Sequence, residues 1–318
     1  MEDSQPSRSS NLDHARNSTT DIPLDLTIEI LSRLPAKSLI RFQCVSKLWF
    51  SIIRSKDFTD SFLTRSKTQP RLLFTFNHLK LWECFIFSAP EHNNKDYDDK
   101  ASTVVGRHDM TMSADHAYSI ASRPVNGFFC GRHGDNSIAV CNPTTRQIVK
   151  LPDVVSNGRQ VNARLGYDPV QDQYKVLCVM MFYRYLDHGR DIKQEHFVFT
   201  VSSPQKEWRK IEIPQGVTYD MVYGGICIDG AIYYGVGDSG IVRFDVRSEK
   251  LVLIQAPEKS HITTTNSSTL LNYNGKLGRV DYSYDDEMVL WILEDDEKQE
   301  WSETRRALPS EWYDLLFA

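Results

Sequence analysis

Residues 22–62 read IPLDLTIEILSRLPAKSLIRFQCVSKLWFSIIRSKDFTDSF, and this stretch decides how the chain begins to fold. Leu26, Ile30 and Leu34 fall at i, i+4 and i+8, so one face of the first helix is apolar over two turns. Pro23 fits the first turn of a helix, because the N–H that proline lacks would have no partner there. The spacing therefore predicts an amphipathic helix at the start of the stretch.

The rest of the stretch predicts two or three further short helices. Pro35 ends the first helix, Ser46 is placed to cap a third, and a fourth short turn begins at Asp57. A segment of roughly 40 residues is near the size below which chains usually need metal, disulfides or a partner to be stable. It has no ligand or disulfide pattern, so we expect a partner to cover the first helices. Residues 52–62 are expected to pack inward, toward the linker and the first strands.

The pieces LxxEIL, RLP, KSL, RF and CVSKxW follow one another at fixed intervals, and together they resemble an F-box. The resemblance implies docking onto a Skp-type adaptor and, through it, onto a cullin-based ubiquitin ligase. On the family pattern the adaptor contacts, mixed with some internal packing, would come from Pro23, Leu26, Ile30, Leu31, Leu34, Pro35, Leu39, Cys44, Val45 and Trp49. The alternative is that these residues only pack a small helical subdomain onto the rest of the chain, and bare periodicity does not separate the two.

Composition limits the classes of protein that the chain can be. Its 318 residues allow about two domains, and 41% hydrophobic with 25% charged residues is ordinary for a soluble globular protein. A net charge of −5 without a basic stripe argues against a nucleic-acid partner. The six cysteines form no CxxC, and neither a signal peptide nor a membrane-spanning apolar run is present. We expect a reducing intracellular location, cytoplasmic or nuclear, with no membrane partner.

The hydrophobic period changes after the helical stretch. Residues 1–20 are predicted to be a disordered tail, residues 21–64 the F-box, and residues 65–70 a polar linker. From residue 71 to 318 the period shortens toward two, with turn residues every eight to twelve residues or so. Asn126-Gly127, Asp229-Gly230 and Asn274-Gly275 favour tight hairpin turns. Prolines close units of about fifty residues, which is the size of a four-stranded propeller blade.

The fold class predicted is therefore α+β multidomain: a small N-terminal all-α F-box followed by an all-β propeller-like domain of about five or six irregular blades. The stretches GFFC, IAVCNPTTRQIVKLP, LGYDPVQDQYKVL and WRKIEIP, among others in order, resemble the plant F-box-associated domain. That resemblance implies a domain that recruits proteins for ubiquitination, but it transfers no target and no binding residues. The whole chain is then expected to be a non-catalytic substrate-recognition subunit of a Skp–cullin–F-box ligase. A scaffold that pairs the adaptor with a partner outside a ligase is the alternative.

The target-binding surface is expected in loops, because propellers recognise partners through loops from several blades. The candidates by position are Arg132–Asn136, Tyr183–Lys193, Val217–Tyr223 and Tyr282–Glu287. Tryptophans near the ends of the units are interpreted as blade-packing residues.

Signals for chemistry are weak, and we expect no catalytic residue, metal or cofactor. Gly235–Gly240 has dinucleotide-loop spacing but leads into a predicted strand, so it indicates a hairpin turn. The set His108, Asp109, Asp115, His116 and His133 lacks zinc-ligand spacing and is interpreted as surface residues. Cys130 and Cys141 are interpreted as buried small hydrophobes. The acidic run Glu294–Glu297 lacks an EF-hand pattern and indicates a solvated hairpin tip, and no GxSxG occurs.

Overall fold

Two structural units divide the chain, Met1–Gln69 and Pro70–Ala318, and each is described by itself. The computed structural model describes residues 22–69, 71–78, 83–90, 106–113, 119–120, 123–133, 137–154, 160–186, 189–214, 217–219, 221–236, 240–257, 269–282 and 287–307. The predicted tail at residues 1–20 lies outside these ranges.

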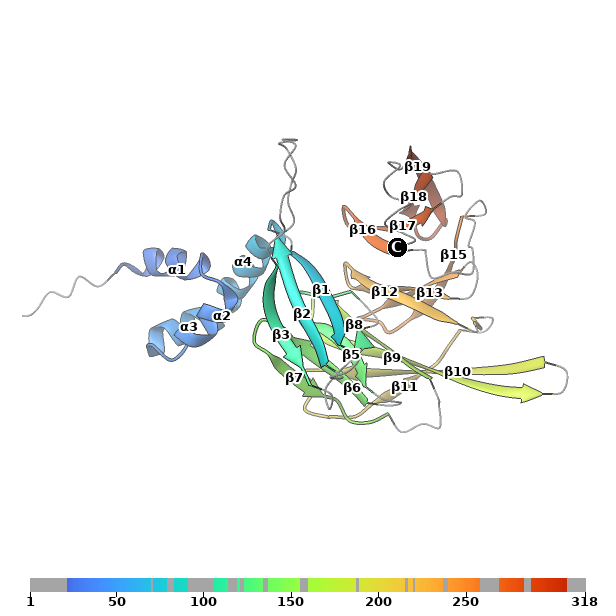
Figure 1. The fold of residues 1–318 in the computed structure, drawn as a ribbon, viewed down its shortest axis with the longest axis horizontal. Helices are drawn as coiled ribbons and strands as arrows, with labels where there is room; N and C mark the ends of the chain where they lie inside the picture. Colours follow the sequence, from blue (N-terminus) through green and yellow to red (C-terminus); the bar gives the residue numbers. More distant parts are fainter. Residues whose placement is uncertain are drawn as a thin grey trace, which may run out of the picture. The chain divides into compact units, whose positions relative to one another are not determined.

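The first unit is a group of four helices (Figure 1). They are α1 (Leu24–Ser32), α2 (Ala36–Phe42), α3 (Lys47–Arg54) and α4 (Lys56–Lys67). Ser46 caps α3 as predicted, because its Oγ accepts the backbone N–H of Trp49 at 3.1 Å. The fourth helix is longer than the predicted short turn and runs three residues into the predicted linker. Ser55 caps it, and no glycine or proline interrupts the chain before Pro70.

Replacing Ser46 with alanine is expected to lower the free energy of unfolding of the helical unit by about 1 kcal/mol. The reason is that alanine has no side-chain oxygen, so an N–H of the first turn of α3 loses its acceptor. Urea denaturation of the full chain, followed through the far-ultraviolet circular dichroism of its helices, measures the change. Ser51→Ala is the matched control, since Ser51 is exposed in the interior of α3 and alanine favours helix there. Equal stabilities for the two variants would contradict the capping role.

A small core holds the four helices together. Its buried members are Leu31, Leu39, Ile52, Ile53 and Phe58. Leu34, Phe42, Trp49 and Phe62 pack against it and are partly buried. The rings of Phe42 and Trp49 meet edge to face, with centroids 5.4 Å apart, as aromatic pairs prefer. The segment 52–62 thus supplies three of the five buried side chains of this core.

The second unit consists of five antiparallel sheets, which confirms a propeller of five blades. The first sheet has three strands and the other four have four each. The first two sheets are β1 (Arg71–His78), β2 (Glu83–Pro90) and β3 (Arg107–Met112), then β4 (Ser119–Ile120), β5 (Phe129–His133), β6 (Ser137–Asn142) and β7 (Gln147–Lys150). The third is β8 (Gln160–Asp168), β9 (Gln173–Leu186), β10 (Gly189–Thr200) and β11 (Arg209–Ile211). The last two are β12 (Val222–Ile228), β13 (Ala231–Val236), β14 (Gly240–Asp245) and β15 (Leu251–Gln255), then β16 (Thr269–Tyr273), β17 (Lys276–Tyr282), β18 (Glu287–Asp295) and β19 (Glu300–Ala307).

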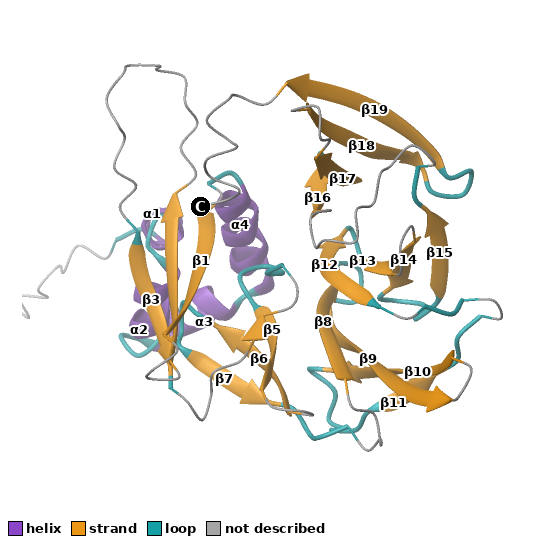
Figure 2. Cartoon of the chain, turned by 45° about the vertical axis from the view of Figure 1, so that its right-hand side comes forward, coloured by secondary structure: helices purple, strands orange, loops and turns teal. Residues whose placement is uncertain are grey.

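Each blade packs face to face on the next through an apolar layer. The layers contain, for example, Ile86 with Phe129, Cys130 with Val176, Val179 with Tyr234, and Ile241 with Leu293. Figure 2 shows the five sheets one after another, with β8, β12 and β16 toward a common centre. These first strands contact one another in chain order, β8 with β12 and β12 with β16. Because successive side chains of a strand point to opposite faces, alternating apolar residues give a sheet an apolar face, and these faces pack between neighbouring blades.

Two tryptophans connect the outer ends of neighbouring blades, as predicted. The indole N–H of Trp208, just before β11, donates to the backbone oxygen of Pro152 at 2.7 Å, shortly after β7. In the same way Trp301 of β19 donates to the oxygen of Gln255 at 3.1 Å, the last residue of β15. Each tryptophan therefore ties an outer strand to the end of the preceding blade.

The three predicted tight turns are confirmed by their backbone angles. In Asn126-Gly127, Asp229-Gly230 and Asn274-Gly275 both residues have positive φ, which the common two-residue hairpin turn requires. One predicted loop is wrong, however. Residues 183–193 belong largely to β9 and β10, which pair in register from Lys175 with Thr200 out to Leu186 with Gly189. This hairpin projects at the right of Figure 1. Aromatic and β-branched residues such as Tyr183, Tyr185 and Ile192 favour strand there.

Within the described part of the chain, no helix has both the length and the apolar character that crossing a membrane requires.

Candidate partner-binding surface

The helical unit exposes far more apolar side chain than its core buries. Its exposed large apolar residues are Ile22, Leu24, Leu26, Ile28, Ile30, Ile40, Val45, Leu48 and Phe50. We call this set the exposed apolar surface. Single exposed apolar residues are normal on a protein, but a dense group within residues 22–50 indicates a surface that a partner covers.

The geometry of α1 explains how one helix presents so much apolar surface. Thr27 and Leu31 form its buried side. Leu26 and Ile30, four residues apart, lie on one flank of that side, and Leu24 and Ile28 lie on another. One short helix thus carries two exposed apolar stripes beside the stripe that enters the core.

The structure divides the ten residues of the predicted adaptor contact into three groups. The exposed ones are Pro23, Leu26, Ile30, Pro35, Cys44 and Val45. Leu34 and Trp49 are partly buried and pack against the core. Leu31 and Leu39 are 0% and 5% exposed, so they support the surface from beneath. The spacing alone did not separate these groups, because buried and exposed apolar stripes share the helical period.

Sequence reasoning missed six residues of the exposed apolar surface: Ile22, Leu24, Ile28, Ile40, Leu48 and Phe50. Leu24 and Ile28 had a usable signal, since they repeat at i and i+4 beside the stripe that was recognised. Ile40 and Phe50 each follow directly on a residue, Leu39 or Trp49, that packs in or on the core. On a helix such neighbours point about a quarter turn apart, and only the structure shows which of them is covered.

The charge of the helical unit is positive, although that of the whole chain is negative. Residues 22–69 contain eight Lys and Arg against four Asp and Glu. One acid, Glu29, is already paired with Arg33 at 2.6 Å on the solvent side of α1. The unit that carries the exposed apolar surface therefore has excess positive charge, which favours a partner with acidic residues around an apolar centre.

The candidate metal ligands of the β unit do not come together within the described residues. No group of three or more metal-ligating side chains is found there, while Asp115 and His116 lie outside the described ranges. His108 is exposed as predicted, but Asp109 is buried and paired with Arg107 at 2.7 Å. That part of the surface prediction is wrong, because an ion pair allows a carboxylate to be buried.

The remaining chemical signals have structural explanations. Cys130 and Cys141 are buried, and burial raises the pKa of both thiols, so they are the small hydrophobes that were predicted. β13 and β14, on either side of residues 237–239, are paired antiparallel strands with no helix following, so a dinucleotide site is excluded there. In the acidic hairpin after β18, Asp295 Oδ1 accepts the backbone N–H groups of Glu297 and Lys298. This is a turn contact.

Comparison with known proteins agrees with both units. Residues 20–61 match the model of the F-box domain, and residues 71–317 match that of the F-box associated beta propeller domain. F-box protein At1g30790 of Arabidopsis thaliana is 39% identical over 325 residues, covering 95% of this chain and 79% of that protein. F-box protein At5g65850 is 37% identical (92% and 73% covered), and F-box protein DOR is 35% identical (93% and 76% covered), both from the same plant.

Proteins with an F-box are in general non-catalytic adaptors of Skp–cullin–F-box ubiquitin ligases, and the F-box in general binds a Skp-type adaptor.

Proposed function

The chain belongs to the family of F-box proteins with an F-box-associated β-propeller domain, and from this premise we propose that it is the substrate-recognition subunit of a Skp–cullin–F-box ubiquitin ligase. The helical unit binds a Skp-type adaptor, which joins it to a cullin inside the cell, and the β unit holds a target protein. In this role the subunit needs no acid, base or nucleophile of its own. The contribution of the subunit is tethering, which raises the effective concentration of a target lysine at the ubiquitin-carrying enzyme.

The exposed apolar surface is the observation that supports this proposal. The core of the helical unit is already filled by Leu31, Leu39 and their neighbours, so the exposed residues are not needed for internal packing. Burying a fully exposed Leu or Ile side chain contributes about 1.5–3 kcal/mol, and because these side chains are about half exposed, covering each contributes about half of that. Several of them together are enough for a stable complex, and the excess of Lys and Arg in the helical unit fits an acidic rim on the adaptor.

Leu26→Asp combined with Ile30→Asp is expected to weaken binding to a Skp-type adaptor by about a hundredfold or more, because two unpaired carboxylates would have to be buried in the interface. Both side chains are about half exposed, at 52% and 48%, so the helical unit should stay folded. The measurement is calorimetric titration of the purified full-length chain with adaptor, alongside circular dichroism.

The matched control makes the same chemical change on the other unit. Val170→Asp with Val252→Asp alters two exposed valines of the β unit and should leave adaptor affinity unchanged. Undiminished binding by the Leu26/Ile30 double variant would overturn the assignment of the surface. If the wild-type chain binds adaptor but fails to join a reconstituted cullin assembly, the scaffold alternative replaces the ligase role.

A further inference from the structure

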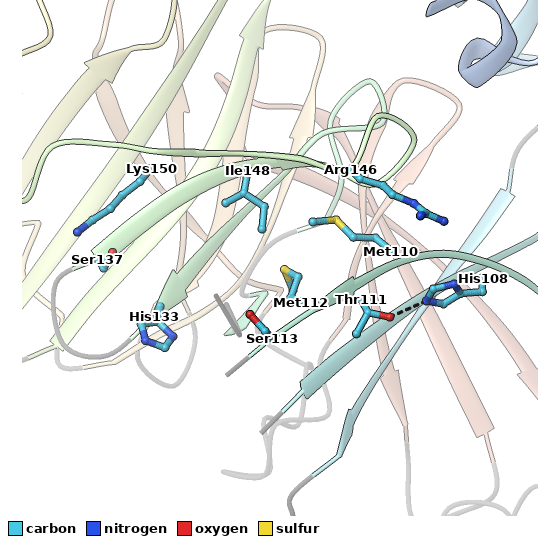
Figure 3. A pocket seen from close by; sticks show the side chains of 10 residues that line it. All are labelled: His108, Met110, Thr111, Met112, Ser113, His133, Ser137, Arg146, Ile148 and Lys150. Atoms are coloured by element: carbon cyan, nitrogen blue, oxygen red, sulfur yellow. Dashed lines mark hydrogen bonds between the residues drawn. The ribbon is translucent and has the colours of Figure 1, made fainter. Parts of the chain in front are cut away.

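A groove with a volume of about 720 Å³ lies between the first two blades (Figure 3). Its described lining residues are His108, Met110, Thr111, Met112, Ser113, His133, Ser137, Arg146, Ile148 and Lys150. They come from β3 and the residue after it, from β5 and β6, and from the β6–β7 turn and β7. The volume is in the range of sites that hold a ligand the size of a few residues.

The charge of the groove is opposite to that of the chain as a whole. Arg146 and Lys150 are permanent cations, two histidines accompany them, and none of the described lining residues carries a carboxylate. Two described acids lie close to these residues in the sequence, and both have partners. Asp109 is buried against Arg107, and Asp153 meets Lys150 only at 3.6 Å, with both side chains more than half exposed. Such an exposed pair contributes little and yields readily to a better partner.

Arg146 is held in place before any ligand arrives. It ends a turn whose backbone is fixed by Asn142, since the Asn142 side chain accepts the N–H groups of Thr144 and Thr145 at 3.0 and 3.2 Å. Its Nε donates to the backbone oxygen of Asp109 at 2.8 Å, which ties the turn to β3. Arg146 lines the groove, and within the described residues no carboxylate forms an ion pair with its guanidinium.

The floor and walls of the groove suit an extended chain. Ile148, which is partly buried, supplies an apolar wall, and Met110 and Met112, which are 3% and 1% exposed, form the apolar layer beneath it. Among the described strands β3 pairs only with β2, and β7 only with β6. Each therefore has one edge whose backbone groups no described strand uses, and such edges accept extended peptides.

We propose that this groove binds an extended segment of the target protein in which Asp or Glu side chains alternate with apolar ones. Cations are spread along the groove: in Figure 3 Arg146 and Lys150 point to opposite sides, with His108 below Arg146 and His133 below Lys150. Dispersed cations match a row of single carboxylates, whereas one phosphate group requires donors that converge on it. That the bound segment belongs to a ubiquitination target rests on the proposed function; the binding itself does not.

The test is fluorescence anisotropy of the full-length chain with labelled short peptides. A peptide alternating Glu and Leu should bind, and one alternating Gln and Leu should bind about tenfold or more weakly, because it lacks the charges. Arg146→Glu with Lys150→Glu should lower affinity for the Glu peptide by a similar factor. Arg146→Gln with Lys150→Gln, which disturbs the turn less, should show a smaller loss of affinity for the Glu peptide. Lys206→Glu with Lys250→Glu alters exposed lysines elsewhere on the β unit and should change nothing.

Three results would overturn the proposal: no binding of the Glu peptide, equal binding of the Gln peptide, or tighter binding of a Gln/Leu peptide carrying a single phosphoserine. Adaptor affinity, measured on the same samples, should be the same for all groove variants. A chain that binds adaptor but not peptide loses only the groove assignment, and a chain that binds peptide but not adaptor loses only the ligase role.

Discussion

Truncating Leu31 to alanine should unfold the helical unit in an otherwise folded chain. Leu31 is completely buried at the centre of the core, between residues of α2, α3 and α4. Removing a buried leucine side chain costs about 3 kcal/mol or more, from lost transfer energy and the cavity left behind. A unit of this size has only a few kcal/mol of stability to lose. The expected loss of stability therefore approaches or exceeds the whole free energy of unfolding of the unit.

Thermal denaturation of the full-length chain, followed through the far-ultraviolet circular dichroism of α1 to α4, measures the effect. Leu26→Ala is the matched control, because it makes the same chemical change on the same helix at a residue that is half exposed. It should shift the transition of the helical unit far less. Excess adaptor should partly restore folding of the Leu31 variant, since a ligand that binds only the folded state stabilises it.

Changes at these two leucines should both weaken adaptor binding, but for different reasons. Leu31→Ala should weaken adaptor binding only through unfolding, so the loss should diminish at low temperature or high adaptor concentration. Leu26→Asp with Ile30→Asp should weaken binding of a folded unit under all conditions. If the Leu31 variant melts like the wild type, the core assignment is wrong and Leu31 belongs to the contact surface.

Local rules predicted much of the fold because they act over a few residues. Ser46 as a helix cap, the three Asn-Gly or Asp-Gly turns and the proline-bounded blades each follow from nearby sequence, and the structure confirms the cap and the turns. The outer part of the β9–β10 hairpin was missed because polar and charged residues interrupt its alternation. There the two strands pair with each other, while β8 reaches only Met181 and β11 only His196.

The candidate sites could be recognised only from the three-dimensional structure. His108 and His133 drew notice as metal ligands, but Arg146 did not, because nothing in the sequence places a residue of the second blade beside β3. In the helical unit, Leu31 and Ile30 are neighbours of equal hydrophobicity with opposite roles. Burial, which separates them, depends on how α1 packs on the other helices and not on its own period.

A buried polar network in the β unit was also not predictable from the sequence, and it predicts that the stability of this unit depends on pH. His196 Nε2 bonds to the hydroxyl of Tyr219, whose oxygen lies 3.0 Å from that of Tyr234. The guanidinium of Arg164 lies over the Tyr234 ring at 4.6 Å, and its Nε donates to the backbone oxygen of Gly224 at 2.7 Å. These side chains come from four separate segments of the chain, so no sequence motif predicts the network.

The stability of the β unit should fall as the pH is lowered from about 6.5 toward 4. Burial, and secondly the nearby Arg164 charge, lower the pKa of His196 from 6.5 to about 4. Below pH 6.5 the unfolded chain takes up a proton at this imidazole, while the folded chain does not. Unfolding is therefore favoured by about 1.4 kcal/mol for each pH unit in this window, or about 2 kcal/mol between pH 6.5 and 5.

His196→Gln isolates this effect, because the amide can keep a hydrogen bond to Tyr219 but does not titrate. Urea denaturation of the full chain at pH 7, 6 and 5 should show a clearly smaller loss of stability for this variant than for the wild type. His108→Gln, which removes an exposed histidine, should keep the wild-type slope. Carboxylates such as Asp168, whose pKa is lowered by its hydrogen bonds with Arg247, titrate below this window and do not blur the comparison. Equal slopes of stability against pH for the wild type and His196→Gln would contradict the prediction, because they would mean that the imidazole already carries its second proton in the folded protein. The Nδ1 N–H would then need an acceptor, and the described residues supply none.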